Sequence, residues 1–123
     1  MRKTTTKSLK RKLWQVFSLW VRERDKHKCV CCGNPASDAG HFAHMGKGNR
    51  MFCIPELDEA NVNAQCRRCN HFLSGNLYVY GKYLERKYGE KMIKRIQAEK
   101  TKPHKVSDQT LKDLIERYDI GNS

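Results

Sequence analysis

Two pairs of cysteines have the spacing of metal ligands. The first pair is Cys29 and Cys32, followed by Gly33, and the second pair is Cys66 and Cys69. A gap of two residues lets two thiolates bind one ion from a tight turn, and four thiolates make a closed tetrahedral zinc site. Because the chain has only 123 residues, such an ion would supply much of its folding free energy. The spacing therefore predicts a structural Zn²⁺ at these four cysteines.

The other two cysteines leave alternatives open. Cys31 lies inside the first pair and could replace a neighbour as a ligand, or it could be a spare reduced thiol. Cys53 stands alone in RMFCIP, where a small buried hydrophobic residue is the simpler interpretation. Six cysteines could also form disulfides in a secreted protein, but the paired spacing favours metal binding.

The interval from Cys32 to Cys66 contains side chains suited to hydrolytic chemistry. It is longer than the ~15–20 residues of a compact four-cysteine site, so it houses something more. His41 lies in the stretch DAGHF, and DEANVNAQCRRCN contains Asn61 and ends at Asn70. A neutral histidine, with an unperturbed pKa near ~6.5, can accept a proton from water at cellular pH. A loop histidine and a metal ligand are the alternative interpretations of His41.

A helix and then a segment of turns must position these residues. Apolar residues recur at helical spacing from Leu13 to Val21, which predicts a helix over Leu9 to Asp25. The basic stretch before it is either a flexible arm or the frayed start of that helix. Glycine and proline punctuate residues 28–76, which predicts turns and short strands there. The candidate chemistry therefore lies in the middle of the chain.

Further helices are predicted in the last third of the chain. Helical spacing resumes after Gly75, with interruptions near Gly81 and Gly89. Ser107 or Asp108 is the expected N-cap of a final helix. We expect one domain over residues 1–123, made of a basic arm and helix (1–27), a zinc-bound core (28–76) and C-terminal helices (77–123).

The chain is strongly basic. It has 25 Lys and Arg against 13 Asp and Glu, a net charge of +12, which favours a polyanionic partner such as nucleic acid. No stretch approaches the ~20 apolar residues that span a bilayer, and the basic start lacks the apolar run of a signal peptide. We therefore expect an intracellular protein with no membrane partner and no small-molecule cofactor. The cations singled out for phosphate contacts are Lys10, Arg11, Lys12, Lys47, Arg50, Arg67 and Arg68, and for the last four a solvated basic rim is the alternative.

The combination of motifs resembles a known family. DAGHF, DEANVNAQCRRCN and the pair Gly75 and Asn76, preceded by a helix of the VFSLWVRERD type, are similar to the phage recombination protein family NinG, also called Rap. The resemblance covers roughly Leu13 to Tyr88. Members of that family are structure-specific endonucleases that act on branched DNA intermediates of recombination. The layout is also similar, more distantly, to phage endonuclease VII, a zinc-containing Holliday junction resolvase.

The resemblance implies a fold and a set of roles. The fold would be α+β, with a small zinc-stabilised, treble-clef-like ββα-metal core of the His-Me finger or His-Asn-His type and flanking N- and C-terminal helices. His41 would be the general base on a strand, and Asn61 would brace the hairpin from a loop. Asn70, on a helix, would bind one catalytic Mg²⁺ or Mn²⁺.

The chain departs from the wider nuclease group beside the histidine. That group often has an acidic metal ligand immediately before its catalytic histidine, where this chain has Gly40. On a strand, Asp38 and Gly40 share a face, so Asp38 is the expected second ligand. A shift of one position would make His71 a ligand in place of Asn70.

The resemblance therefore implies a metal-dependent endodeoxyribonuclease of the HNH type that would cut Holliday junctions and D-loops. Two cuts are needed to resolve a four-way junction, so we expect a homodimer. The helix after Gly75 or the final helix could form its interface, with packing onto the monomer core as the alternative. A zinc-knuckle module that binds nucleic acid without cutting it is the alternative function, and a zinc protein that docks on another protein is a third. A phage-encoded protein would act in the host cytoplasm.

Overall fold

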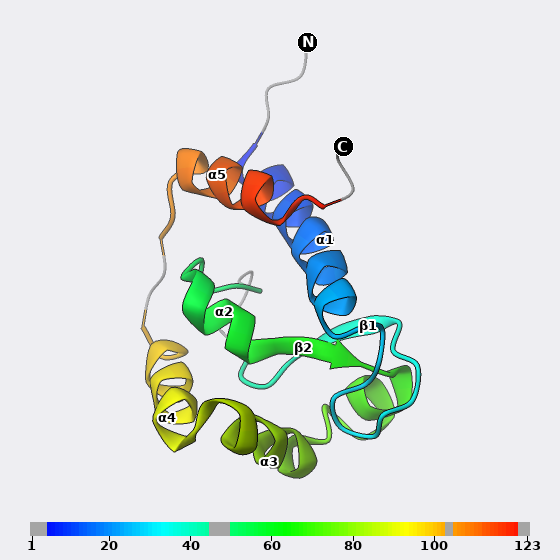
Figure 1. Cartoon of the computed structure of the whole chain (residues 1–123). Coiled ribbons are helices and arrows are strands. Elements are labelled where there is room, and N and C mark those ends of the chain that lie inside the picture. The colour runs from blue at the N-terminus through cyan, green and yellow to red at the C-terminus, as the bar shows by residue number, and fades with distance from the viewer. Residues whose placement is uncertain (1–4, 45–49, 103–104, 121–123) are drawn as a thin grey trace.

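The computed structural model describes residues 5–44, 50–102 and 105–120, and in these ranges it contains six helical elements and two strands. The architecture is helix-rich α+β with one small two-stranded sheet. Lys47, one of the predicted phosphate-binding cations, lies outside the described residues. In chain order the elements are α1 (Thr6–Arg24), β1 (Asp38–His41), α2 (Pro55–Asn61), β2 (Val62–Gln65), the short π-helical turn η1 (Arg68–Phe72), α3 (Leu77–Tyr88), α4 (Glu90–Glu99) and α5 (Asp108–Tyr118) (Figure 1).

The first helix begins three residues earlier than the apolar stripe predicts. Thr5 is its N-cap, since the Thr5 hydroxyl accepts a hydrogen bond from the amide of Ser8 while the Ser8 hydroxyl accepts one from the amide of Thr5. This reciprocal capping box satisfies two amides that the helix leaves unpaired. The cap is built from polar residues, so the apolar stripe from Leu13 to Val21 does not reveal it. The buried face of α1 consists of Leu9, Leu13, Val16, Phe17 and Val21.

The final helix packs along α1 (Figure 1). Of the two expected caps, Ser107 is the one observed, because its hydroxyl accepts a hydrogen bond from the amide of Thr110. The ring of Tyr118 meets that of Phe17 edge-on, with centroids 4.7 Å apart. The apolar face of α5, comprising Leu111, Leu114 and Tyr118, is thus buried in the chain's own core.

The two strands pair antiparallel without a hairpin turn. Asp38 lies opposite Gln65 and His41 opposite Val62, and residues 42–61 connect the strands. This connection contains α2, which begins with Pro55 at its first turn, a position that suits proline. Asn61 was expected in a loop, but it is the last residue of α2 and is fully buried. With 7 residues, α2 is too short for its apolar residues to show a helical period in the sequence.

Two helices lie beneath β2 in Figure 1. The helix resumes at Leu77, as predicted after Gly75, and α3 breaks from α4 at Gly89, whose φ of 92° suits glycine. Gly81 does not interrupt α3; its Cα faces the ring of Phe42, and a Cβ atom there would lie 3.4 Å from that ring. In the ranges that the structure describes, no helix is both long enough and apolar enough to cross a membrane.

Candidate functional site

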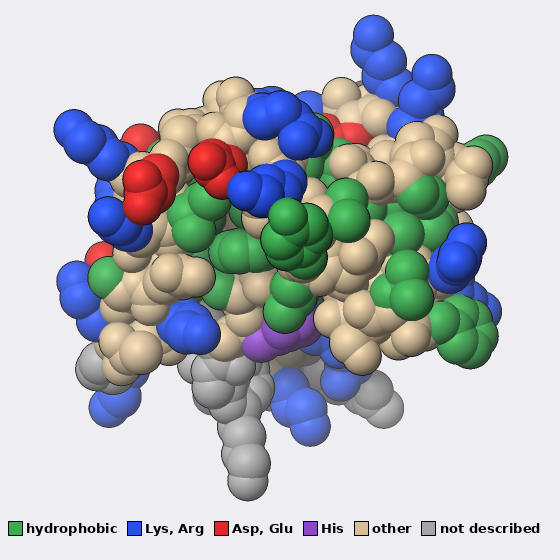
Figure 2. Space-filling view, turned by 90° about the horizontal axis from the view of Figure 1, so that it is seen from below, with side chains coloured by type: hydrophobic (Ala, Val, Ile, Leu, Met, Phe, Trp, Pro, Cys, Tyr) green, Lys and Arg blue, Asp and Glu red, His purple; other side chains and the backbone are tan. Residues whose placement is uncertain are grey.

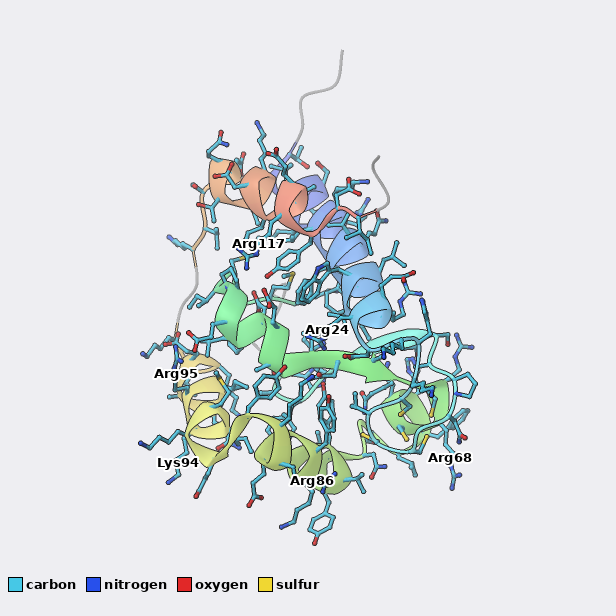
Figure 3. All side chains as sticks on the ribbon, viewed as in Figure 1. Arg24, Arg68, Arg86, Lys94, Arg95 and Arg117 are labelled. Carbon is cyan, nitrogen blue, oxygen red and sulfur yellow. The ribbon has the colours of Figure 1, made fainter. Side chains whose placement is uncertain are left out.

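The four paired cysteines converge on one point. Four ligand atoms lie within 4.8 Å of one another, namely Sγ of Cys29, Cys32, Cys66 and Cys69. Figure 3 shows the sulfur atoms gathered near Arg68. The Cys32 and Cys66 sulfurs are 3.6 Å apart, close to the ~3.8 Å that tetrahedral Zn–S bonds of ~2.3 Å require. The four cysteines could therefore hold a structural metal such as zinc.

The backbone around the cluster is shaped for metal ligation. Gly33 has a φ of 80° and its amide donates to the carbonyl of Cys29, which closes the first turn. In the second turn the amide of Cys69 donates to Sγ of Cys66. Burial opposes ionisation of Cys29, but hydrogen bonds from the backbone of Cys66, Cys32 and Cys31 outweigh it and lower the pKa of that thiol to about 7. The first turn thus favours the thiolate of Cys29, whereas burial raises the pKa of Cys69 in the second turn.

The two remaining cysteines lie outside this cluster. Sγ of Cys31 accepts a hydrogen bond from Nε2 of Gln65, and burial raises the pKa of Cys31 to about 11. Cys31 is therefore a neutral thiol beside the cluster. Cys53 is partly buried against the core that contains α1, and burial raises its pKa to about 11 as well.

His41, the last residue of β1, is held in one orientation. Its imidazole stacks on the indole of Trp14, with centroids 4.8 Å apart and 16° between the ring planes. Nε2 donates a hydrogen bond of 2.6 Å to the backbone carbonyl of Arg50. Because a carbonyl can only accept, Nε2 carries the proton and Nδ1 of the neutral ring has a free lone pair. His44 lies nearby, with its ring centroid 5.3 Å from that of His41.

The surroundings keep His41 neutral. Burial is the main cause of a low pKa, which falls to about 4. The hydrogen bond to Arg50 opposes this shift, whereas the charges of His44 and Arg50 add to it. At pH 7 the imidazole is therefore unprotonated at Nδ1.

Asn61 ties the segment after His41 to the end of α2. Its Oδ1 accepts from the amide of Ala43 at 2.8 Å, and its Nδ2 donates to the carbonyl of Ala43 at 3.0 Å. The hydroxyl of Tyr80, on α3, donates to the carbonyl of Gly40 at 2.7 Å. The backbone is thus fixed on both sides of His41, by contacts from α2 and α3.

Gly40 forms the floor of an oxygen-lined site, which we call the Gly40 cradle. A Cβ atom built on Gly40 would lie 2.8 Å from Oδ1 of Asn70 and closer still to Oε1 of Gln65. Neither neighbour leaves room for a side chain, which accounts for glycine at position 40. Amide oxygens are among the ligands of Mg²⁺ in proteins, so these two oxygens could contribute to holding a hard divalent ion.

Asp38 orients Asn70 beside this cradle. Nδ2 of Asn70 donates to Oδ2 of Asp38 at 3.3 Å, which turns Oδ1 of Asn70 toward Gly40. His71, the alternative ligand, places Nε2 3.3 Å from the same carboxylate oxygen, and its side chain is 61% exposed. Asn70 therefore faces the cradle and His71 faces the solvent side of Asp38.

The imidazole and the cradle lie on opposite faces of β1. Ala39 and His41 face α1, while Asp38 and Gly40 face η1, as strand alternation requires. Consecutive Cα atoms are only ~3.8 Å apart. A proton acceptor at His41 and two amide oxygens at Gly40 thus lie on opposite sides of the C-terminal end of β1.

Some of the predicted cations line a groove on α1. This α1 groove has a cavity volume of about 690 Å³, and Trp14, which stacks on His41, forms part of its wall. Its floor is partly apolar, from Leu13, Met51 and Val106. The cations that line it are Lys7, Lys10, Arg11 and Arg50. Lys7 was not singled out in the sequence, although it belongs to the same basic stretch.

The other predicted cations lie elsewhere. Lys12 is exposed on α1 and is not among the groove residues. Arg67 and Arg68, which lie between Cys66 and Cys69 in the chain, are both exposed, and Figure 3 shows Arg68 beside the sulfur atoms. Basic side chains also outnumber acidic ones on the face seen in Figure 2. The positive charge is therefore spread widely, and only part of it adjoins His41.

Two residues of the candidate site, Trp14 and Gln65, were not predicted from the sequence. Trp14 lies beside the apolar stripe of α1, so its spacing indicates packing and nothing more. Gln65 directly precedes Cys66, and its position at the end of β2 carries no ligand motif. Only the pairing of β1 with β2 brings Gln65 opposite Asp38.

Comparison with known proteins gives consistent matches. The family model described as Bacteriophage Lambda NinG protein matches residues 1–121. Protein ninG of Escherichia phage 933W is 32% identical over 88 residues, which cover 68% of this chain and 42% of the relative. Protein ninG of Salmonella phage P22 is 30% identical over 108 residues, which cover 85% of this chain and 51% of the relative. Protein ninG of Escherichia phage lambda is 31% identical over 88 residues, which cover 68% of this chain and 41% of the relative. The chain thus spans about half, or less, of these relatives, and no solved structure gives a significant match.

Proposed function

This chain belongs to the bacteriophage NinG family, and we propose that it is a metal-dependent endonuclease that hydrolyses phosphodiester bonds in branched DNA. The proposed substrates are Holliday junctions and D-loops formed during recombination. In this proposal β1, β2 and η1 make the ββα-metal core of a His-Me finger nuclease. The observation that carries it is the tautomer of His41, whose Nε2 proton is held by the carbonyl of Arg50.

His41 is the general base of the proposed reaction. Nδ1 takes a proton from a water molecule, and the oxygen of that water forms a bond to phosphorus. The bond between phosphorus and the 3′ oxygen breaks, and the 3′ oxygen takes a proton from solvent. The products carry a 5′ phosphate and a 3′ hydroxyl. A pKa of about 4 keeps the base form fully populated at pH 7, although it makes Nδ1 a weak proton acceptor.

Asn61 is a positioning residue in this scheme. It holds Ala43, two residues after His41, through both polar atoms of its amide. A displacement of a base by about 1 Å can lower a rate on the order of a hundredfold, so this support bears on the rate.

The Gly40 cradle is the proposed metal-binding site. A divalent cation, Mg²⁺ or Mn²⁺, would stabilise the charge on the phosphate and on the leaving oxygen when bound. Asn70 would hold it through Oδ1, with Asp38 keeping the amide turned. The cysteine cluster would hold a structural Zn²⁺ and fix the turn from which η1 begins.

The α1 groove would position the DNA backbone. Its cations can contact phosphates regardless of base sequence, which suits recognition of branched shape. A homodimer would supply the two sites needed for two cuts. Its interface would not use the apolar face of α5, because Leu111 and Leu114 are already buried against α1.

A second candidate function is a zinc-knuckle module that binds nucleic acid without cutting it. The groove favours it, because four cations around a partly apolar floor suffice for binding. Such a module has no need of a fixed imidazole tautomer or of an oxygen-lined cradle, which is why we prefer the nuclease.

Cleavage assays separate the two candidates. Purified full-length chain is incubated with a four-way junction, a linear duplex and a plasmid, in Mg²⁺, Mn²⁺ or EDTA. The nuclease proposal expects junction cleavage that needs the divalent ion and falls at least a hundredfold in His41→Asn. The matched control is His27→Asn, because His27 is an exposed histidine that pairs with Glu23 at a positive φ that Asn tolerates. Binding without cleavage under every metal would leave the binding module standing.

A further inference from the structure

Gln65 has a buried oxygen without a partner. Its side chain is fully buried, and Oε1 is the one buried side-chain polar atom in the described residues that makes no hydrogen bond. Nε2 is satisfied, since it donates to the carbonyl of Gly75 at 2.8 Å. Native proteins leave few buried acceptors unpaired, because removing such a group from water without a replacement partner is unfavourable.

The orientation of this amide is fixed by its neighbours. Exchanging the oxygen and nitrogen would set Oε1 against the carbonyl of Gly75, so that two acceptors would face each other. Nε2 also donates to Sγ of Cys31 at 3.4 Å. The unpaired oxygen therefore belongs on the side of Gly40.

A second amide oxygen approaches the same point. Oδ1 of Asn70 and Oε1 of Gln65 would both collide with a Cβ atom on Gly40. The amide of Asn70 is fixed as well, because its Nδ2 donates to Asp38. Two acceptors that converge without a donor between them repel each other, and a cation between them would remove that repulsion. Ligand oxygens of Mg²⁺ lie ~2.1 Å from the ion and hence about 3–4 Å from one another.

We propose that Oε1 of Gln65 is a direct ligand of the divalent cation, beside Oδ1 of Asn70. Gly40 is then required because any side chain there would fill the space between ligand and ion. Asp38 acts mainly by holding Asn70. The inference rests on the proposed function, since it concerns the cation of the same site, and it adds a ligand that the sequence motifs do not contain.

The test measures metal binding without DNA. Full-length, zinc-loaded chain is titrated with Mn²⁺, and free Mn²⁺ is followed by electron paramagnetic resonance. Gln65→Met keeps the side-chain volume and removes the oxygen. Its control is Asn63→Leu, since Asn63 is equally buried two residues earlier on β2 but bonds to Ala60 and Tyr80 instead. We expect Gln65→Met to weaken Mn²⁺ binding at least tenfold and Asn63→Leu to leave it within twofold, with zinc content and circular dichroism unchanged.

A second measurement needs no variant. Adding Mg²⁺ to the wild-type chain should shift the side-chain carbonyl ¹³C signals of Gln65 and Asn70, while that of Asn63 stays in place. Saturable Mn²⁺ binding that survives in Gln65→Met, an unmoved Gln65 signal, or no saturable binding by wild type would each overturn the inference. Mn²⁺ binding through Gln65 in a chain that cuts no DNA would instead refute the proposed nuclease and leave the ligand assignment intact.

Discussion

Trp14 of α1 covers one face of His41, with the two rings 16° from parallel and their centroids 4.8 Å apart. The guanidinium of Arg50 lies 5.6 Å from the centroid of the Trp14 indole, and the carbonyl of Arg50 accepts the Nε2 proton of His41. One face of the imidazole is therefore covered by a side chain that lies 27 residues earlier in the chain. This contact makes α1 part of the candidate site, in addition to its place in the core.

Replacing Trp14 by Leu should raise the pKa of His41. Burial is the largest cause of the value near 4, and removing the indole admits water to the ring, so the pKa should move toward ~6.5. The measurement is an NMR titration of the imidazole signals. Trp20→Leu is the control, because Trp20 packs on Phe17 and Tyr118, away from His41. A pKa that stays near 4 in Trp14→Leu, or rises equally in both variants, would refute this account.

His41 should also make the fold less stable in acid. Its pKa is ~6.5 in an unfolded chain and about 4 when folded, so the unfolded state binds the proton more readily. The contribution to stability is complete above pH ~6.5 and is lost as the pH falls toward 4, by at most about 2 kcal/mol at pH 5. Urea unfolding at pH 7 and pH 5 should therefore show a larger loss in wild type than in His41→Asn. Both chains share the cysteines, so thiolate protonation cancels in the difference; equal losses would contradict the prediction.

The elements that the sequence predicts well are those with long periodicity or a clear cap. The stripe from Leu13 to Val21 and the Ser107 cap identify α1 and α5, because burial of one face imposes the spacing. The seven residues of α2 are too few to show a period, and so Asn61 was placed in a loop. Its contact with Ala43 depends on tertiary packing that no local pattern encodes.

The candidate site also has one part that the sequence predicts and one part that it does not. The cysteine cluster is predictable because each pair of thiols lies within one tight turn of the chain. The Gly40 cradle is not, because it needs strand register to bring Gln65 opposite Asp38 and needs η1 to bring Asn70 over Gly40. The family resemblance pointed to Asn70, whereas the unpaired oxygen of Gln65 becomes visible only in three dimensions.

Removing the metal from the cysteine cluster should unfold the chain. Structural zinc binding is worth about 10–16 kcal/mol in small domains, which matches or exceeds the total stability of about 5–15 kcal/mol of a typical domain. Cys66→Ser should therefore lose zinc, measured by metal analysis, and lose helical circular dichroism. Cys31→Ser should keep one zinc per chain, because Cys31 lies outside the cluster and contacts Gln65. Zinc loss in Cys31→Ser, or none in Cys66→Ser, would overturn the assignment of ligands.

Asn61→Ala should lower cleavage more than its effect on stability explains. The substitution leaves the amide and the carbonyl of Ala43 buried without partners. It should therefore lower the free energy of unfolding, measured in urea, by about 2–4 kcal/mol. Asn63→Ala is the matched control, since Asn63 is also fully buried and makes several hydrogen bonds. Under conditions where both variants are folded, Asn61→Ala should cut at least tenfold more slowly than Asn63→Ala. Equal rates would show that Asn61 is purely structural.

Neighbouring cations of α1 should differ in their contribution to DNA binding. Arg11 lines the α1 groove, whereas the adjacent Lys12 is exposed outside it, so Arg11→Gln and Lys12→Gln remove the same charge from two places. Each phosphate contact contributes about one to the slope of log affinity against log salt concentration. Fluorescence anisotropy with a labelled four-way junction over a range of NaCl should show a slope reduced by about one in Arg11→Gln and little changed in Lys12→Gln. Because net charge is identical in the two variants, equal slopes would mean that DNA responds to the overall charge and that the groove is not its binding site.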